Sequence, residues 1–316
     1  MTEPAKPPAP KTIAIVNERA GNGAMADIYR RLEHRIEDAV GPTDVAFTDG
    51  TGHATTLARE ALGKGYTRIL VGGGDGTINE VVNGFFDAAG APINPEAELA
   101  LLAGGTGGDY RKSVQVRDAD ETIAALAAGH TRRVDLGRLT YTAHDGTTQT
   151  RIFDNIAGFG LAGRVVSHVP RYRGLGGRAA YFGATLQGLW GWKNPRVRLT
   201  LDGVARAPQP IVTVAVGKGR FFGGGMMICP DARLDSGMFE VTVLGDLSRL
   251  ELIMMSSTIY KGAHVYHPKV SIGRARVVLA EAVDGDEVLI DVDGEGPGRL
   301  PATFEVLPAA LKLVAP

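Results

Sequence analysis

The sequence of 316 residues contains a single cysteine, Cys229, which excludes an internal disulfide and a zinc site built from several cysteines. No stretch reaches the roughly 18 apolar residues that a membrane-spanning helix needs. The net charge of −1 provides no overall attraction to nucleic acid. A chain without disulfides suits a reducing compartment. We therefore expect a cytoplasmic globular protein that does not bind nucleic acid.

The proline-rich start, residues 1–10, lacks the long apolar core of a secretory signal, and we expect it to form a flexible tail. The full sequence is 44% hydrophobic and 22% charged, as in ordinary globular proteins. Its length allows two domains.

Glycine is abundant, and it concentrates in a stretch that reads ILVGGGDGTINEVV over residues 69–82. This pattern predicts a buried strand, a glycine turn and a helix. Glycines let the backbone approach a ligand closely, and the N–H groups at a helix N-terminus bind anions, so the turn is a candidate phosphate-binding loop. Asp75 lies in this loop, where a carboxylate repels phosphate unless it holds Mg²⁺ or accepts a hydrogen bond.

Apolar runs at residues 12–16, 45–48, 68–71 and 98–103 alternate with helical patterns. This alternation predicts an α/β domain with a doubly wound parallel sheet, in which ligands bind at the carboxyl ends of the strands. We assign it to residues 11–132, with a last helix capped by Asp118. The residues expected to converge on a nucleotide there are Asn17, Thr48, Gly73, Gly74, Gly76, Thr77, Gly105 and Thr106.

From residue 133 the pattern changes to short β-rich runs with few helical stretches. These runs predict a second, antiparallel and β-sandwich-like domain over residues 133–316. The predicted strands lie at residues 133–141, 151–156, 196–201, 211–216, 239–244, 270–272, 276–279 and 288–292. The last run, residues 303–314, is a candidate to return to the first domain.

Several motifs in order resemble the diacylglycerol kinase catalytic-domain family, which includes bacterial diacylglycerol kinases and the ceramide and sphingosine kinases. The resemblance extends from residue 13 to about residue 314. The motifs are a first loop at residues 17–21 that matches the family's NPxSG, Thr48 with Gly52-His53-Ala54, GGDGTINEVVNG at 73–84, Gly105-Thr106-Gly107 with Asp109, Asn155 with GFG at 158–160, the segment 223–232, and Asp293-Gly294-Glu295. The resemblance implies ATP and Mg²⁺, and a lipid substrate with a hydroxyl group: diacylglycerol, ceramide or a sphingoid base.

The resemblance also implies roles for single residues. Glu295 corresponds to the proposed general base, with Asp293 beside it, and Asp75 supports the nucleotide or the transfer itself. Gly21 and Asn79 join the nucleotide-binding residues by their place in the motifs.

The sequence departs from the family pattern at four places: Glu18 and Ala20 in the first loop, Ala103 where proline is common, Gly108 where asparagine is usual, and Ser236 where aspartate is usual. At the last of these, in the segment LDSGM, some members bind a structural Mg²⁺. Asp235 is then the carboxylate left to hold that metal.

The window between Asp154 and Asp202 has no acidic residue and contains both tryptophans of the protein, Trp190 and Trp192, together with seven basic residues. Basic residues attract anionic headgroups and tryptophan prefers the membrane interface, so peripheral contact with the inner membrane surface is one interpretation. A packed helix with a solvated basic face is the other. The oligomeric state stays open, with a dimer as one possibility.

Two other functions stay open. NAD kinases share the GGDG loop and the two-domain plan, although the 223–232 segment and Asp293-Gly294-Glu295 favour a lipid kinase. A catalytically weak lipid- or nucleotide-binding regulator is suggested by Gly108 and Ser236, whereas the intact Asp75 and Glu295 argue against it.

Overall fold

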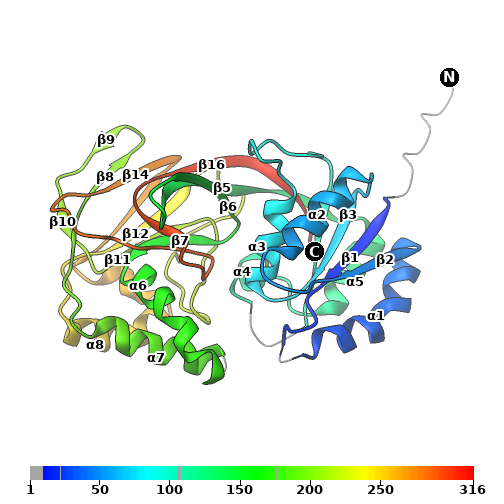
Figure 1. Cartoon of the computed structure of the whole chain (residues 1–316), viewed down its shortest axis with the longest axis horizontal. Helices are drawn as coiled ribbons and strands as arrows, with labels where there is room; N and C mark the ends of the chain where they lie inside the picture. Colours follow the sequence, from blue (N-terminus) through cyan, green and yellow to red (C-terminus); the bar gives the residue numbers. More distant parts are fainter. Residues whose placement is uncertain (1–9, 22, 105–107, 176) are drawn as a thin grey trace. The chain divides into compact units, whose positions relative to one another are not determined.

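The computed structural model describes residues 10–21, 23–104, 108–175 and 177–316, and only the backbone of residues 173–175, 177–179 and 181. Gly105, Thr106 and residues 1–9 of the predicted tail lie outside the described residues. The chain divides into two compact units (Figure 1). Unit 1 comprises Met1–Thr106, Gln115–Arg133 and Leu311–Pro316, and unit 2 comprises Gly107–Val114 and Val134–Ala310.

Unit 1 is built on a parallel sheet with the strand order β16-β4-β3-β1-β2. Its strands are β1 (Thr12–Val16), β2 (Thr43–Phe47), β3 (Arg68–Gly72), β4 (Glu98–Leu102) and the end of β16 (Gly298–Val314). β1, β3 and β4 are buried along their whole length. Continuous burial requires cover on both faces of the sheet, which explains why these strands read as unbroken apolar runs.

Helices cover both faces of the sheet in unit 1, as the doubly wound fold predicts. These helices are α1 (Met25–Val40), α2 (His53–Gly63), α3 (Asp75–Gly84) and α5 (Ala119–Ala128). Helix α1 packs with α5 against alternate strand residues such as Ala14, Val16 and Leu70. The intervening residues, such as Ile15 and Val71, are equally buried and face the side on which α2 packs with α3.

Unit 2 contains a five-stranded antiparallel sheet in the order β13-β12-β11-β7-β15. Its strands are β7 (Ile156–Gly160), β11 (Thr213–Gly217), β12 (Phe239–Leu244), β13 (Val270–Ala275) and β15 (Ile290–Val292). The other strands of the unit are β5 (Thr131–Ala143), β6 (Thr148–Phe153), β8 (Arg196–Leu201), β9 (Val204–Ala205), β10 (Gln209–Pro210), β14 (Val277–Ala282) and the first part of β16. The order β10-β8-β14-β16 is also antiparallel.

A single apolar core joins these two layers of strands. The ring of Phe153 on β6 stacks on Phe239 of β12, with 5.6 Å between the ring centroids, and meets the edge of Phe304 on β16. Alternate residues of β8 and β14 fill the same core. The structure therefore confirms the predicted antiparallel sandwich. It corrects the single predicted strand at residues 151–156, which is two strands, β6 and β7, separated at Asp154 and Asn155.

The sequence reading missed most of the helices of unit 2. They are α4 (Asp109–Val114), α6 (Leu161–His168), α7 (Gly177–Leu189) and α8 (Arg249–Ile259), with short 3₁₀ turns at η1 (Val169–Leu175) and η2 (Ala263–Tyr266). Helices α6 and α8 pack against the five-stranded sheet around Ile156, Ala215 and Leu244. None of the described helices is long and apolar enough to cross a membrane.

Candidate active site

In unit 1, the loop between β3 and α3 meets the end of β1. The backbone N–H of Asn17 donates to the carbonyl of Gly72 at 2.8 Å, and its side-chain amide donates to the hydroxyl of Thr77 at 3.0 Å. A Cβ at Gly73 would lie 2.5 Å from the Cβ of Thr77, so the chain can pass the helix here only with glycine. The backbone N–H of Thr48 donates to Val16 at 3.0 Å. Asn17, Thr48, Gly73 and Thr77 thus lie at the carboxyl ends of neighbouring strands.

The first turn of α3 suits an anion. Gly74 precedes the helix in an extended conformation and has no side chain to cap it. The first N–H groups of a helix have no acceptor within the helix, and they carry the positive end of its dipole. Nothing lies within 4 Å of a Cβ built at Gly74 or at Gly76, so the backbone is open there. This arrangement can bind a phosphate group.

Glu80 of α3 fixes the neighbouring segment, and the sequence reading did not single it out. Its two carboxylate oxygens accept the backbone N–H groups of Gly52 at 2.8 Å and of Ala54 at 3.2 Å, at the start of α2. Gly52 has φ of 81°, a left-handed conformation that favours glycine. The Gly52-His53-Ala54 motif is therefore attached to the same helix as the phosphate-binding loop.

Two other predicted nucleotide-binding residues lie around this loop. Gly21 has φ of 62°, and a Cβ there would lie 3.6 Å from the carbonyl of Gly104 at the end of β4. Asn79 is buried, and its side-chain oxygen accepts the amide of Asn83 at 3.1 Å. The packing of α3 thus accounts for Asn79, and its predicted contact with a nucleotide stays a prediction.

In unit 2, β15 leads into a tight turn that carries the predicted carboxylates. Val292 and Glu295 exchange backbone hydrogen bonds of 2.8 and 2.9 Å, and Asp293 lies between them with φ of 47°. The carboxylate of Asp293 accepts the N–H of Ile156 at 2.9 Å and of Asp154 at 3.2 Å. Burial raises the pKa of Asp293, and these backbone hydrogen bonds oppose the rise. Asp293 therefore holds the β6–β7 corner against the turn.

Glu295 is the accessible carboxylate of this turn. Its side chain is 37% exposed, and Oε2 lies 2.6 Å from an Nη atom of Arg151 on β6. This contact orients the carboxylate. Asp291, two residues before Asp293, is buried, and burial raises its pKa to about 8. Asp291 is buried and Asp293 accepts backbone N–H groups, which leaves Glu295 as the group best suited to accept a proton.

A second network in unit 2 surrounds Asn155, which follows β6. Its amide donates to the carbonyl of Phe221 at 2.8 Å, and its oxygen accepts the hydroxyl of Ser113 on α4 at 3.3 Å. Asp109 at the start of α4 accepts the N–H of Gly224 at 2.7 Å and pairs with Lys112 at 3.1 Å. The glycine segment 223–225 is thereby attached to α4. Asn155 and the 223–232 segment are thus connected through α4.

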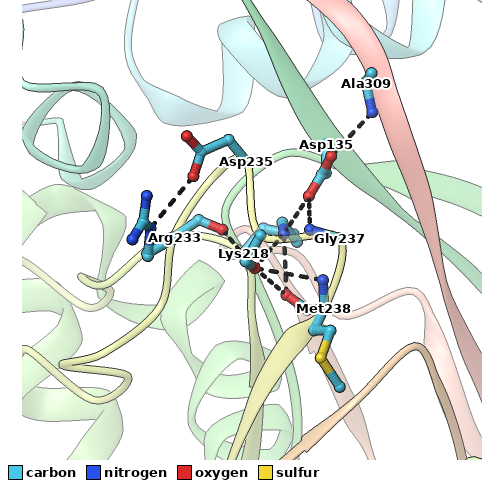
Figure 2. A network of polar contacts seen from close by, with 8 residues as sticks. Asp135, Lys218, Arg233, Asp235, Gly237, Met238 and Ala309 are labelled. Atoms are coloured by element: carbon cyan, nitrogen blue, oxygen red, sulfur yellow. Dashed lines mark hydrogen bonds and ion pairs between the residues drawn. The ribbon is translucent and has the colours of Figure 1, made fainter.

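Asp235, the predicted metal ligand, lies on the surface and pairs with Arg233 at 3.4 Å. Figure 2 shows a different cation near this segment: the ammonium of Lys218 lies 2.7 Å from Asp135 and 3.0 Å from the carbonyl of Met238. It also lies 3.4 Å from the hydroxyl of Ser236. Within the described residues, no group of three or more histidine, cysteine or acidic side chains is arranged to hold a metal. A metal at Asp235 stays a prediction.

Sequence reasoning missed Arg151, Ser113 and Lys218. Their partners are distant in the sequence: Arg151 lies 144 positions from Glu295, and Lys218 lies 83 positions from Asp135. Each is a single residue in a β-rich run or short helix, with no motif around it. The basic window recognised in the sequence begins after Asp154, so it does not include Arg151.

Known proteins match the chain over nearly its whole length. A family model for the diacylglycerol kinase catalytic domain matches residues 11–139, and one for the YegS C-terminal NAD kinase beta sandwich-like domain matches residues 155–315. A diacylglycerol kinase of Mycobacterium tuberculosis is 32% identical over 313 residues, covering 97% of this chain and 95% of the relative. The chain belongs to the diacylglycerol kinase catalytic-domain family. It is a lipid kinase, as the sequence predicted.

One further relative and two solved structures also resemble the chain. A diacylglycerol kinase of Staphylococcus carnosus is 28% identical over 304 residues, covering 96% of this chain and 94% of the relative. A solved structure from Bacillus anthracis shares the fold with a TM-score of 0.77 and 24% identity, covering 100% of this chain and 99% of the other. A structure described as a diacylglycerol kinase from the same organism has a TM-score of 0.70 at 20% identity, with 97% of each chain covered. The two-part fold is thus that of known structures.

Proposed function

We propose that this lipid kinase transfers the γ-phosphoryl group of Mg·ATP to the hydroxyl of diacylglycerol. The relatives that match the chain almost from end to end are named diacylglycerol kinases, which favours this acceptor over ceramide or a sphingoid base. The observation that carries the proposal is the Glu295–Arg151 pair, because it provides an oriented carboxylate at an accessible turn.

The reaction is a displacement at phosphorus. The substrate hydroxyl oxygen attacks the γ-phosphorus, the bond from that phosphorus to the β,γ-bridging oxygen breaks, and ADP leaves. The hydroxyl proton passes to the carboxylate of Glu295. Arg151 orients this carboxylate before the transfer.

The residues of unit 1 support the nucleotide part of the proposal. The open backbone at Gly74 and Gly76 and the first turn of α3 fit the phosphates, and the Asn17–Thr77 pair shapes the adjacent strand end. Mg²⁺ in kinases is held by one or two carboxylates together with the phosphates, and Asp75 at the start of α3 fits that role. The ion supplies charge neutralisation on the phosphoryl group.

Diacylglycerol resides in bilayers, so the enzyme must reach its acceptor at a membrane surface. The basic window that contains Trp190 and Trp192 supports peripheral contact with an anionic leaflet, such as the inner face of the cell membrane. The oligomeric state in which it does so is open, and a dimer is compatible with this role.

The test is transfer of labelled γ-phosphate from Mg·ATP to diacylglycerol, ceramide, sphingosine and NAD in mixed micelles. We expect label in diacylglycerol, and its loss with Glu295→Gln. The matched control is Asp235→Asn, because Asp235 is an exposed carboxylate of the same unit that pairs with Arg233. Label in ceramide or sphingosine alone would change the acceptor, label in NAD alone would favour the NAD kinase alternative, and no label would favour the regulator.

A further inference from the structure

Helix α7 exposes a row of large apolar side chains. Phe182, Leu186 and Trp190 follow one another at intervals of four residues, so they lie on one side of the helix and its end, and they are between 56% and 82% exposed. The opposite side is buried through Ala180 and Ala184. A helix that is apolar on both sides is normally buried in a protein or in a membrane.

Helix α8 repeats this arrangement. Leu250, Ile253 and Met254 are between 61% and 71% exposed, whereas Met255 and Ile259 are buried against the five-stranded sheet. The intervals of three and four residues again place the exposed residues on one side of the helix.

The end of α7 and the start of α8 lie together on the five-stranded sheet of unit 2. Leu189 and Trp192, at the end of α7, and Leu252 and Met255 of α8 pack against one apolar cluster on the five-stranded sheet. A guanidinium nitrogen of Arg249 lies 3.4 Å from the carbonyl of Trp192, which brings the start of α8 to the end of α7. The two helices also lie along the same edge of unit 2 in Figure 1. Their exposed sides therefore form one outer surface, the α7–α8 face, made of Phe182, Leu186, Trp190, Leu250, Ile253 and Met254.

Basic residues predominate around this face, although the exposed Asp246 lies shortly before α8 and accepts a hydrogen bond from Asn194. No acidic residue occurs between Asp154 and Asp202, and α8 has a single one, Glu251. Lys269 lies 2.8 Å from Glu251, and this contact, together with hydrogen bonds from Ser248, lowers the pKa of Glu251 to about 2. The exposed basic residues on these segments are Arg171, Lys193, Arg249 and Lys261.

We propose that the α7–α8 face docks on an anionic lipid bilayer, with its apolar side chains inserted at the interface and the surrounding basic residues on the headgroups. Interfacial helices have this combination of a charged rim and inserted tryptophan, phenylalanine and leucine. The basic rim disfavours a second copy of the chain as the occupant, because a two-fold dimer would place the same basic residues opposite each other. The inference rests on the proposed function, because a kinase that phosphorylates diacylglycerol has to bind a bilayer. It adds α8 to the membrane contact of the basic window.

Flotation of the protein with vesicles tests the proposal without any turnover. We expect the wild type to float with phosphatidylglycerol/phosphatidylcholine vesicles, to release at high salt, and to float poorly with pure phosphatidylcholine. The double variant Ile253→Ser/Met254→Ser should bind at least roughly tenfold more weakly, because two apolar side chains no longer insert. The matched control is Val204→Ser, which removes an equally exposed apolar side chain on β9.

A second readout follows insertion directly. In a Trp192→Phe background Trp190 is the only tryptophan, and its emission should shift to the blue on mixing with anionic vesicles.

Vesicle binding by Ile253→Ser/Met254→Ser equal to that of Val204→Ser would overturn the proposal. So would a wild-type dimer in gel filtration that the double variant converts to a monomer, with no vesicle binding by either. Failure of the proposed function would appear instead as no phosphorylation of a water-soluble short-chain diacylglycerol, with flotation unaffected.

Discussion

Lys218 provides the sharpest test of what stabilises unit 2. Its ammonium is fully buried and lies 2.7 Å from Asp135, which is itself 4% exposed (Figure 2). Burial lowers the pKa of Lys218, and the hydrogen bond that its ammonium donates to Asp135 opposes the fall. The carboxylate of Asp135 also accepts the N–H groups of Gly237 at 2.7 Å and Ala309 at 2.9 Å. It thus ties together β5 and β16 near the positions where the chain passes between the units.

Lys218→Met should destabilise unit 2 by about 3–5 kcal/mol, because it leaves the carboxylate of Asp135 buried without its cation. The double variant Lys218→Met/Asp135→Asn should be less destabilised than the sum of the single changes, because the buried charge is gone and an amide can still accept one of the N–H groups. Urea denaturation followed by tryptophan fluorescence measures this, since both tryptophans lie in unit 2. Lys193→Met removes an exposed lysine and is the control. A Lys218→Met protein within about 1 kcal/mol of wild type would refute the reasoning.

Three further predictions concern the carboxylate turn and the nucleotide loop. The pKa of Asp291 is about 8 in the folded protein against 3.8 unfolded, so its contribution to stability is present below the lower value and is lost as the pH rises through the higher one. Urea denaturation should show that the wild type loses up to about 1.4 kcal/mol per pH unit from this group between those values and that Asp291→Asn does not; equal slopes would contradict this. Arg151→Met should lower kcat roughly tenfold without changing the KM for ATP, and Arg151→Lys should retain most of the wild-type activity. Full activity of Arg151→Met, or an equal loss in Arg151→Lys, would argue against a role of Arg151 in orienting Glu295. Thr77→Val should raise the KM for ATP roughly fivefold to tenfold by removing the hydrogen bond to Asn17, and steady-state kinetics with an unchanged KM would exclude that role.

The parallel part of the fold could be predicted because each of its features is local. Apolar runs such as residues 68–71 alternate with helices, and the carboxyl ends of parallel strands meet at one edge of the sheet. The prediction that Asn17, Thr48 and Thr77 lie together follows from this rule alone, and the structure places them at neighbouring strand ends.

The rest could not be predicted because it depends on contacts between distant segments. Nothing around Arg151 shows that it meets Glu295, 144 positions away. Helices α7 and α8 carry apolar residues on both sides, so they lack the one-sided pattern by which a surface helix is recognised. The break between β6 and β7 was missed although Asp154 and Asn155 favour turns over strands. Their role at the corner depends on the distant Asp293.

The central claim is that Glu295 takes the proton from the lipid hydroxyl, and a single-turnover measurement with labelled ATP and diacylglycerol tests it most directly. Glu295→Gln keeps the size of the side chain and an oxygen for Arg151, but it cannot accept the proton. The account predicts that the rate of label transfer falls by about 10² to 10⁴ while ATP still binds. Transfer by Glu295→Gln at the wild-type rate would contradict it.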